Sequence, residues 1–379
     1  MAALTTRFDH IERAKVITSL MGPRPPYCSA SPSGIEIKSF RGSPEVSDAI
    51  TTGNVDVVPA HLSYIPSLLA GPLKPDVAII SVSPPDKDGW CSFGIGMLYH
   101  RSAAREARIV IAEVNENMPW TFGDSLIHSS EIDFFVRADH PIPVARKSQP
   151  TDAERAVAEN VLEFIPDGAT VQIGMGGMAE AMLEALKARR RIRVHAGVLS
   201  EGVIGLAQSG ALDEKDGAIT TGAFFGGQAV YDFARSNRAV HVHPVEYTHN
   251  SDTLRTFSPF VAINSALQID LSGQANAETV KGRPISGTGG QLDFIRGAAM
   301  SENGLSILAI TATSRDGKHA RIVRQLDFGA GVTTPRTDVD VVITEYGAAH
   351  LRGRGLRERA AALAAIAAPT SIAELQWRD

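Results

Sequence analysis

The chain has 379 residues, of which 44% are hydrophobic and 21% are charged, and its formal net charge is −5. This composition is typical of a globular chain long enough for two domains, and it excludes fibrous, disordered and disulfide-scaffold proteins. The sequence contains no basic cluster of the kind that binds nucleic acid, and no apolar run reaches the roughly 18 residues that a membrane span needs.

Short β-branched segments alternate with alanine-rich helical segments along the chain, a pattern typical of α/β domains with buried parallel strands. The predicted strands are 77–82, 109–114, 132–137, 170–173, 192–195, 239–243, 306–311 and 339–344. Prolines and polar residues over 141–150 suppress regular structure, so we place a domain boundary there. We therefore predict an α/β protein with one domain over 1–147 and a second over 151–379.

The second domain is predicted to open with a capping box, in which the Thr151 side chain serves a free helix amide and Glu154 reaches back. Apolar residues then recur at helical spacing up to a turn at 166–168. A strand, a glycine cluster and a helix over 178–189 follow. We expect this unit to be part of an open α/β sheet.

The cluster Gly174, Met175, Gly176 and Gly177, continued by Met178 and Ala179, fits the dinucleotide fingerprint G-x-G-x-x-G/A between a predicted strand and a helix. A nicotinamide enzyme would also need an acidic residue at the end of the next strand, and none occurs before Glu201. Two interpretations stay open: backbone amides that hold a phosphate or a developing oxyanion, or glycines that only make a tight turn.

A second glycine cluster comprises Gly287, Gly289 and Gly290, with Thr288 between them. It indicates either a further anion-binding loop or a flexible connection. No G-x-x-x-x-G-K-[ST] motif is present, which argues against a P-loop nucleotide enzyme.

Other candidate groups are weaker. His241 and His243 would share one face of a strand, but neither H-E-x-x-H nor C-x-x-C is present, so we expect no metal site. Cys91 is interpreted as a packed thiol rather than a nucleophile. With two cysteines in the chain and no secretory signal at its start, we expect a cytoplasmic protein.

Several ordered segments together resemble the acetyl-CoA hydrolase/transferase family, and within it the 4-hydroxybutyrate CoA-transferase-like group. The matching stretches span about residues 45 to 368 and include the segments 83–94, 111–119, 123–128, 174–177, 200–203, 263–267, 270–274, 286–294 and 341–347. Each stretch alone is weak, but the ordered series is specific. The family's opening helix and first strand have no clear counterpart before Cys28, so we expect a first domain that is short at its start.

The resemblance implies two similar open-sheet domains of the CoA-transferase type, with the active site in the cleft between them. It also implies exchange of CoA between an acyl-CoA and a small carboxylic acid through a glutamyl thioester. Gly289 and Gly290 are then the candidate oxyanion loop, and Gly174, Met175, Gly176, Gly177 and Gly287 the candidate CoA-binding residues. CoA or acyl-CoA would be a substrate, and no tightly bound cofactor is expected.

Two positions depart from the family pattern that the resemblance implies. Gln268 stands where the attacking glutamate is expected, and Tyr64 stands where another glutamate is usual. A carboxamide is a poor nucleophile, so the glutamyl route would fail by orders of magnitude. Tyr64 and His61 become alternative proton carriers.

Three accounts of Gln268 stay open: an engineered isostere, a natural paralogue with altered acyl-CoA chemistry such as hydrolysis or acyl transfer, and a catalytically silent binding paralogue. Glu201, Glu246 and Glu345 lie in family-like segments and are candidates for a replacement carboxylate, although acidic residues at turns are more often capping groups. The glycine loop alone also leaves an oxidoreductase as a weaker alternative. The family resemblance further implies a homodimer.

Overall fold

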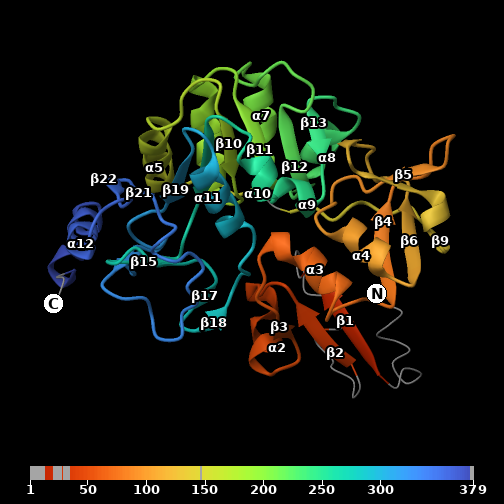
Figure 1. The fold of residues 1–379 in the computed structure, drawn as a ribbon, viewed down its shortest axis with the longest axis horizontal. Helices are drawn as coiled ribbons and strands as arrows, with labels where there is room; N and C mark the ends of the chain where they lie inside the picture. Colours follow the sequence, from red (N-terminus) through yellow and green to blue (C-terminus); the bar gives the residue numbers. More distant parts are fainter. Residues whose placement is uncertain (1–12, 20–27, 29–34, 146, 376–379) are drawn as a thin grey trace.

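The computed structural model describes residues 13–19, 28, 35–145 and 147–375. Its centre is a nine-stranded sheet in which every neighbouring pair is parallel except β21 and β22 (Figure 1). The strand order is β22 (Gly347–His350), β21 (Val341–Thr344), β19 (Leu305–Ala309), β14 (Phe260–Asn264), β10 (Thr170–Ile173), β11 (Arg193–Leu199), β12 (Ile219–Phe224), β13 (Val240–Val242), β7 (Phe122–Gly123).

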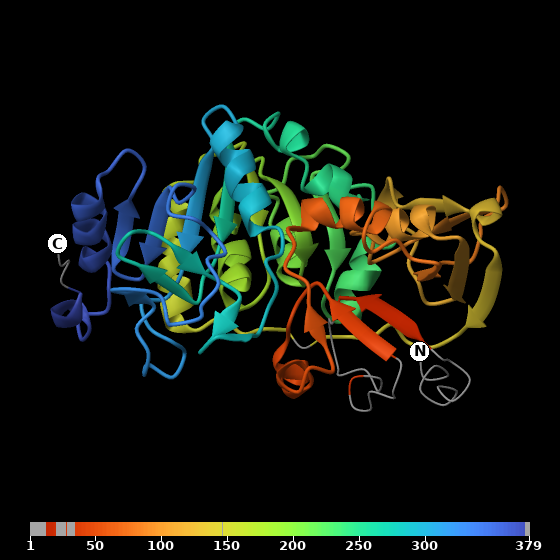
Figure 2. The same ribbon diagram turned by 60° about the horizontal axis from the view of Figure 1, so that its bottom comes forward.

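Helices cover both faces of this sheet, so its strands are buried almost throughout (Figures 1 and 2). One face carries α5 (Asp152–Leu162), α6 (Gly177–Ala185), α7 (Gly202–Gln208) and α8 (Gln228–Ala234). The other carries α9 (Val245–Thr248), α10 (Ser251–Leu254) and α11 (Gln291–Met300), while α12 (Leu356–Ala365) packs on β22 at the edge. No described helix combines the length and the apolar character that a bilayer crossing requires.

The chain reverses direction across the sheet between β10 and β14. From β10 the strands proceed through β11 and β12 to β13, and the chain then returns to place β14 on the other side of β10. Ligands of open α/β sheets bind outside the carboxyl ends of the strands at such a reversal. Both glycine clusters lie in segments that leave these ends, after β10 and between β14 and α11.

The N-terminal half forms smaller sheets that pack beside the large one (Figure 1). They are β1 (Ala14–Thr18) with β2 (Ile35–Ser39) and β3 (Asp56–Val57), β4 (Val77–Val82) with β6 (Ile109–Asn115) and β9 (Phe134–Ala138), and β5 (Trp90–Ser92) with β8 (Leu126–His128). Short helices connect them, namely α2 (Ser47–Thr51), α3 (Ile65–Ala70) and α4 (His100–Glu106). β7 comes from this half yet forms an edge of the large sheet, and one apolar cluster includes side chains from both halves.

A long excursion between β14 and α11 carries four very short strands. These are β15 (Gln268–Asp270), β16 (Ala275–Asn276), β17 (Thr279–Val280) and β18 (Arg283–Pro284), and β20 (Ile322–Val323), from a later loop, pairs with β15. The excursion delivers the second glycine cluster to the start of α11.

The α/β fold predicted from the sequence is confirmed, and the strands at 77–82 and 170–173 have the predicted bounds. The capping box is also present: the Thr151 hydroxyl accepts from the Glu154 amide, and the Glu154 carboxylate accepts from the Thr151 amide. Two central strands, β12 and β14, were not predicted. β12 reads Ile-Thr-Thr-Gly-Ala-Phe: its glycine and alanine interrupt residues that favour strands, and its burial between helices stabilises it.

Candidate functional site

The second glycine cluster lies where the two halves of the chain meet. The amide of Gly42 donates to the Ser286 carbonyl at 2.8 Å, and the amide of Leu62 donates to the Gly289 carbonyl at 3.0 Å. A Cβ on Gly287 would lie 2.5 Å from the Phe40 carbonyl oxygen, so this position accepts only glycine. The segment 286–290, called here the 286–290 loop, is therefore held against the N-terminal half by backbone contacts.

His61 and Tyr64 stand beside this loop on the N-terminal side. His61 forms a parallel bridge with Gly289, and its buried Nδ1 atom has no hydrogen-bond partner among the described residues. Tyr64 follows in the same turn, but its side chain is 61% exposed. The structure thus brings His61 against the loop and leaves most of the Tyr64 ring in solvent.

The first turn of α11 is tied to the same N-terminal segment. The Ser63 hydroxyl and amide both donate to the Asp293 carboxylate, at 2.7 Å and 3.2 Å. Burial raises the pKa of Asp293, and these hydrogen bonds oppose that shift. Amides at the start of a helix have no intrahelical partner, so those that follow Gly290 are available to an anion.

His249 lies on the sheet side of the loop and was not predicted as a site residue. Its ring is 2% exposed and packs between two glycines: a Cβ on Gly290 would lie 2.3 Å from Nε2, and one on Gly197 would lie 2.9 Å from it. Burial lowers the pKa of His249 to about 3, so the ring is neutral. Its Nε2 atom has no partner among the described residues.

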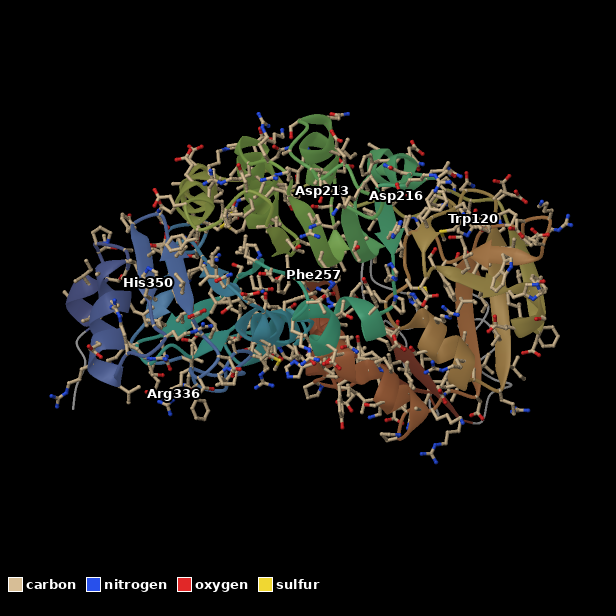
Figure 3. The ribbon with its side chains drawn as sticks, turned by 45° about the horizontal axis from the view of Figure 1, so that its top comes forward. Trp120, Asp213, Asp216, Phe257, Arg336 and His350 are labelled. Atoms are coloured by element: carbon tan, nitrogen blue, oxygen red, sulfur yellow. The ribbon has the colours of Figure 1, made fainter. Side chains whose placement is uncertain are left out.

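An aromatic cluster supports His249 from the interior. The Phe294 ring lies 4.5 Å from the His249 ring, and Phe257, near the centre of Figure 3, lies 4.9 Å from the His195 ring. Burial lowers the pKa of His195 to about 4, and its Nε2 contacts the Thr248 carbonyl at 2.8 Å. Both histidines are therefore neutral side chains inside an apolar environment.

Glu278 and Arg41 place charges next to the loop. The Thr288 hydroxyl donates to the Glu278 carboxylate at 3.2 Å, and the Glu278 carbonyl accepts from Ser286 at 3.2 Å. Arg41 lies against Gly287, donates from Nε to the Gly42 carbonyl at 3.3 Å, and has its pKa lowered by burial. Neither was predicted, because the contacts that bring them to the loop join distant segments.

Gln268 begins β15, opposite Asn276 in the excursion. Its side chain is partly buried, and Oε1 accepts from the Asp327 amide at 3.4 Å. Asn276 in turn accepts from the Glu278 amide at 3.1 Å, so the segment that pairs with Gln268 leads to the carboxylate beside Thr288. The assignment of position 268 as the attacking position stays a prediction.

The first glycine cluster contributes to a separate cavity at the carboxyl edge of the sheet. Met175 and Gly176 line this cavity of about 270 Å³, together with Lys147, Glu180 and Glu201. Gly176 has a φ of 102°, and a Cβ there or at Gly174 would meet open space, whereas one on Gly177 would lie 2.6 Å from a Glu154 oxygen. None of residues 286–290 lines the cavity.

The three glutamates considered as replacement carboxylates each accept a hydrogen bond. Glu201 accepts from the Gly227 amide at 2.7 Å, Glu345 accepts from the Ala312 amide at 2.8 Å, and Glu246 accepts from the Ser102 hydroxyl. These contacts fix neighbouring loops and are the capping and bracing roles expected of acidic residues at turns.

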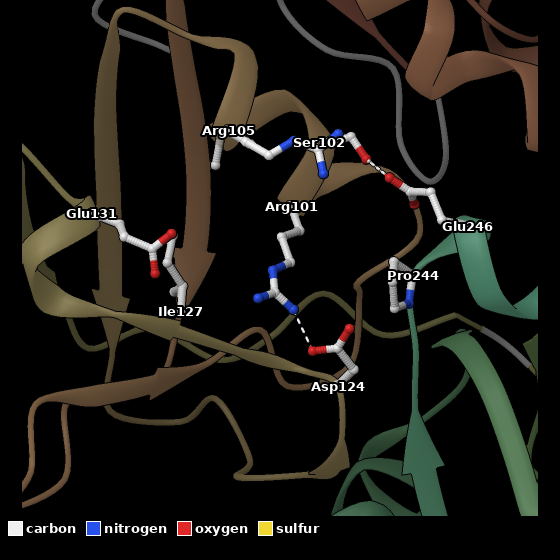
Figure 4. Close-up of a pocket in the computed structure, with 9 residues that line it drawn as sticks. Arg101, Ser102, Arg105, Asp124, Ile127, Glu131, Pro244 and Glu246 are labelled. Atoms are coloured by element: carbon white, nitrogen blue, oxygen red, sulfur yellow. Dashed lines mark hydrogen bonds and ion pairs between the residues drawn. The ribbon is translucent and has the colours of Figure 1, made fainter. Parts of the chain in front are cut away.

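A larger cavity of about 360 Å³ lies between α4 and the segment that follows β13 and begins α9 (Figure 4). Arg101 points into it and pairs with Asp124, and Glu246 reaches Ser102 at its rim. The cavity combines arginine and carboxylate side chains, and His249 is not among the residues that line it.

The remaining candidates occupy structural positions. His241 and His243 lie on one strand face with ring centroids 6.0 Å apart, and burial lowers the pKa of His243 to about 4. Cys91 is fully buried, and burial raises the pKa of its thiol, as expected of a packed side chain. Among the described residues, no three or more His, Cys, Asp or Glu side chains are grouped to hold a metal ion.

Comparison with known proteins assigns the family. Residues 27–146 match the acetyl-CoA hydrolase/transferase N-terminal domain, and residues 226–378 match the C-terminal domain. The chain belongs to the acetyl-CoA hydrolase/transferase family. It is 44% identical over 328 residues to the 4-hydroxybutyrate coenzyme A transferase of Clostridium kluyveri, which covers 85% of this chain and 76% of the relative.

Two solved structures of the family share the fold. RipA from Yersinia pestis is 27% identical with a TM-score of 0.88, over 99% of this chain and 94% of that one. The 4-hydroxybutyrate CoA-transferase of Porphyromonas gingivalis is 33% identical with a TM-score of 0.79, over 98% of this chain and 95% of that one. The family resemblance of the sequence is therefore confirmed.

Proposed function

We propose that this protein is an acyl-CoA enzyme that transfers CoA between an acyl-CoA and a small carboxylic acid at the seam between its two halves. The observation that carries the proposal is the 286–290 loop, which leads into the N-terminus of α11 and contacts the N-terminal half through Gly42 and Leu62. Free amides at such a position stabilise the oxyanion that forms when a thioester carbonyl is attacked.

Each side of the loop has a role in this proposal. Gly289 and Gly290 present the backbone that holds the tetrahedral oxyanion, and Arg41 supplies a positive charge beside Gly287 for a carboxylate or the departing thiolate. His61 is a candidate proton carrier on the N-terminal side, and Tyr64 is the alternative. The cavity at Met175 and Gly176 is a candidate for part of the CoA molecule.

Gln268 favours a transfer route without a glutamyl thioester. In that route the acceptor carboxylate attacks the thioester carbonyl, the C–S bond breaks, and a mixed anhydride and CoA thiolate form. The thiolate then attacks the other carbonyl of the anhydride, which releases the original acyl group as its acid. No charge or atom is left over, and a neutral side chain at position 268 does not prevent either step.

Hydrolysis is the second candidate function. The neutral side chain at Gln268 removes the expected attacking glutamate, while the oxyanion loop remains, so water could take the acceptor's place. Incubation with acetyl-CoA, with and without a carboxylic acid, separates the two functions: transfer yields the CoA thioester of the added acid, and hydrolysis yields free CoA thiol without any added acid. A silent binding paralogue would bind acetyl-CoA and produce neither.

Gly289→Ala tests the site with a matched control. Gly289 has a φ of 62°, and a Cβ there would meet only the Gly287 carbonyl oxygen, at an ordinary contact distance of 3.9 Å. Gly168 has a φ of 80° and open space around it, but it lies in a turn after α5. Each substitution, Gly289→Ala or Gly168→Ala, adds about 1 kcal/mol of backbone strain, so the free energy of unfolding should fall by the same amount in both variants.

Only Gly289→Ala should lower kcat, by about 10²-fold or more, since it alone obstructs the oxyanion position. The assay follows acetyl-CoA consumption in the presence of a series of short carboxylic acids. If kcat falls equally in both variants, or falls in neither, the proposal that the reaction takes place at the loop is contradicted.

We further propose that the protein is a cytoplasmic homodimer. One face of the sheet formed by β4, β6 and β9 supports the dimer, because Val77, Ile79, Phe134 and Val136 are between 43% and 58% exposed there. Contiguous apolar surface of this kind marks interaction sites. Ile79→Lys should lower the mass measured by light scattering to that of one chain, and an unchanged mass would place the interface elsewhere.

A further inference from the structure

We propose that His249 is a neutral hydrogen-bond donor of the 286–290 loop, which presents Nε2–H to the carbonyl oxygen of a bound thioester. The inference rests on the proposed function and adds a residue to it. The Nε2 atom of His249 is buried between Gly197 and Gly290, and it has no hydrogen-bond partner among the described residues.

The contacts of the Thr248 hydroxyl support a ring proton on Nε2. The Pro244 carbonyl already accepts from the amides of Tyr247 and Thr248, each at 3.0 Å. The Thr248 hydroxyl lies 3.2 Å from that same carbonyl but only 2.8 Å from Nδ1 of His249. The hydroxyl has one proton for these two acceptors, and we assign it to Nδ1, the nearer of the two. A neutral imidazole that accepts at Nδ1 carries its proton at Nε2.

The neutral state follows from the surroundings. The described groups next to the ring carry no charge: Gly197 on β11, Gly290 before α11, Phe294 on α11, the Thr248 hydroxyl, and His195, itself neutral. A neutral imidazole is a weak base but a competent donor to a developing oxyanion. Donation at Nε2, rather than proton abstraction, is the chemistry this environment allows.

The position of Nε2 complements the loop. Gly290 is the residue before the first turn of α11, whose amides are free, and the His249 ring edge lies against that same residue from the sheet side. An oxygen atom at the loop would thus receive donors from the backbone and from one side chain. An orphaned buried donor destabilises a fold, and a site for an acceptor gives a reason to keep one.

The tautomer is the test that does not depend on activity. In protein labelled with ¹⁵N at histidine, His249 should show Nε2 protonated and Nδ1 unprotonated at pH 7. Acetyl-CoA should shift its Nε2 resonance and leave that of His100, whose Nδ1 contacts the Gly96 carbonyl at 2.9 Å, unchanged. A proton found on Nδ1, or no shift at His249 while CoA binds, would overturn the proposal.

Two variants supply the kinetic readout. His249→Asn keeps a donor, and His249→Leu removes it while keeping an apolar side chain of similar bulk. We expect kcat for acetyl-CoA to fall about 10²-fold or more in His249→Leu and by less in His249→Asn, with KM little changed in either. Equal kcat in the two folded variants would contradict a donor role. If the unaltered protein neither turns over nor binds acetyl-CoA, the proposed function fails instead.

Discussion

Acid should destabilise this protein through two buried histidines, and the size of the effect can be worked from the structure. His195 and His249 are each 2% exposed, and burial lowers their pKa values to about 4 and about 3. In the unfolded chain a histidine titrates near pH 6.5. The folded-state pKa values are therefore depressed, so the unfolded state takes up protons that the folded state refuses.

The sign follows from this difference in proton uptake. The contribution of these residues to stability is fully present above about pH 6.5 and is lost progressively as the pH falls toward the folded-state values. Each histidine costs at most about 1.4 kcal/mol per pH unit in that window, which amounts to roughly 2 kcal/mol between pH 7 and pH 5. Together they remove roughly 4 kcal/mol, a large part of a typical stability of about 5–15 kcal/mol.

Urea unfolding at pH 7, 6 and 5 measures the effect. The unaltered protein should lose stability over this range, and His249→Asn should lose about 2 kcal/mol less because one titrating group is gone. The carboxyl of Asp293, whose pKa is raised by burial, acts in the opposite direction, since it favours the folded state as the pH falls. Identical pH slopes in the variant and the unaltered protein would refute the assignment of His249 as a buried neutral ring.

Three further predictions concern the site. The family resemblance implies that position 268 is the attacking position, so Gln268→Glu should create CoA exchange through a covalent glutamyl thioester. Mass spectrometry of the protein after incubation with acetyl-CoA would detect this adduct. Absence of the adduct would remove position 268 from the mechanism. His61→Gln should lower kcat by about 10²-fold because it removes a proton carrier. Tyr64→Phe, at a 61% exposed position, should change kcat by less than about twofold. A larger loss of kcat in Tyr64→Phe than in His61→Gln would make Tyr64 the proton carrier. Gly290→Ala places a Cβ 2.3 Å from the His249 ring and should lower the free energy of unfolding by about 1–3 kcal/mol, measured with urea, and should also lower activity. An unchanged stability would show that the ring moves away freely.

Local patterns predicted the parts of the fold that local physics determines. The apolar run at 77–82 and the segment 170–173 became strands with the expected bounds, and Thr151 with Glu154 formed the expected cap. β14 was missed, although it is a central strand, because it follows a proline-containing turn and gains its hydrogen bonds from β10 and β19. Pairing between distant strands leaves little trace in a short window of sequence.

The candidate site divides in the same way. Gly287, Gly289 and Gly290 were recognisable because the sequence shows them as a cluster and the family resemblance implies a role for it, and the structure places His61 beside Gly289. His249 and Glu278 were missed, since each becomes relevant only through a contact with the loop from another segment. A buried histidine has no sequence signature of its own; the signal that could have indicated it is the glycine at 197, whose hydrogen side chain leaves room for the ring.

The distribution of unpartnered buried atoms supports the proposal that the 286–290 loop binds a ligand. Six buried side-chain atoms lack a hydrogen-bond partner in the described part of the chain, and two of them are histidine nitrogens on either side of the 286–290 loop: Nδ1 of His61 and Nε2 of His249. Folded proteins rarely leave such groups unsatisfied, because each one costs stability. Two at one five-residue loop, next to the amides at the start of α11, support our proposal that the loop binds an oxygen-rich ligand such as a thioester flanked by a carboxylate.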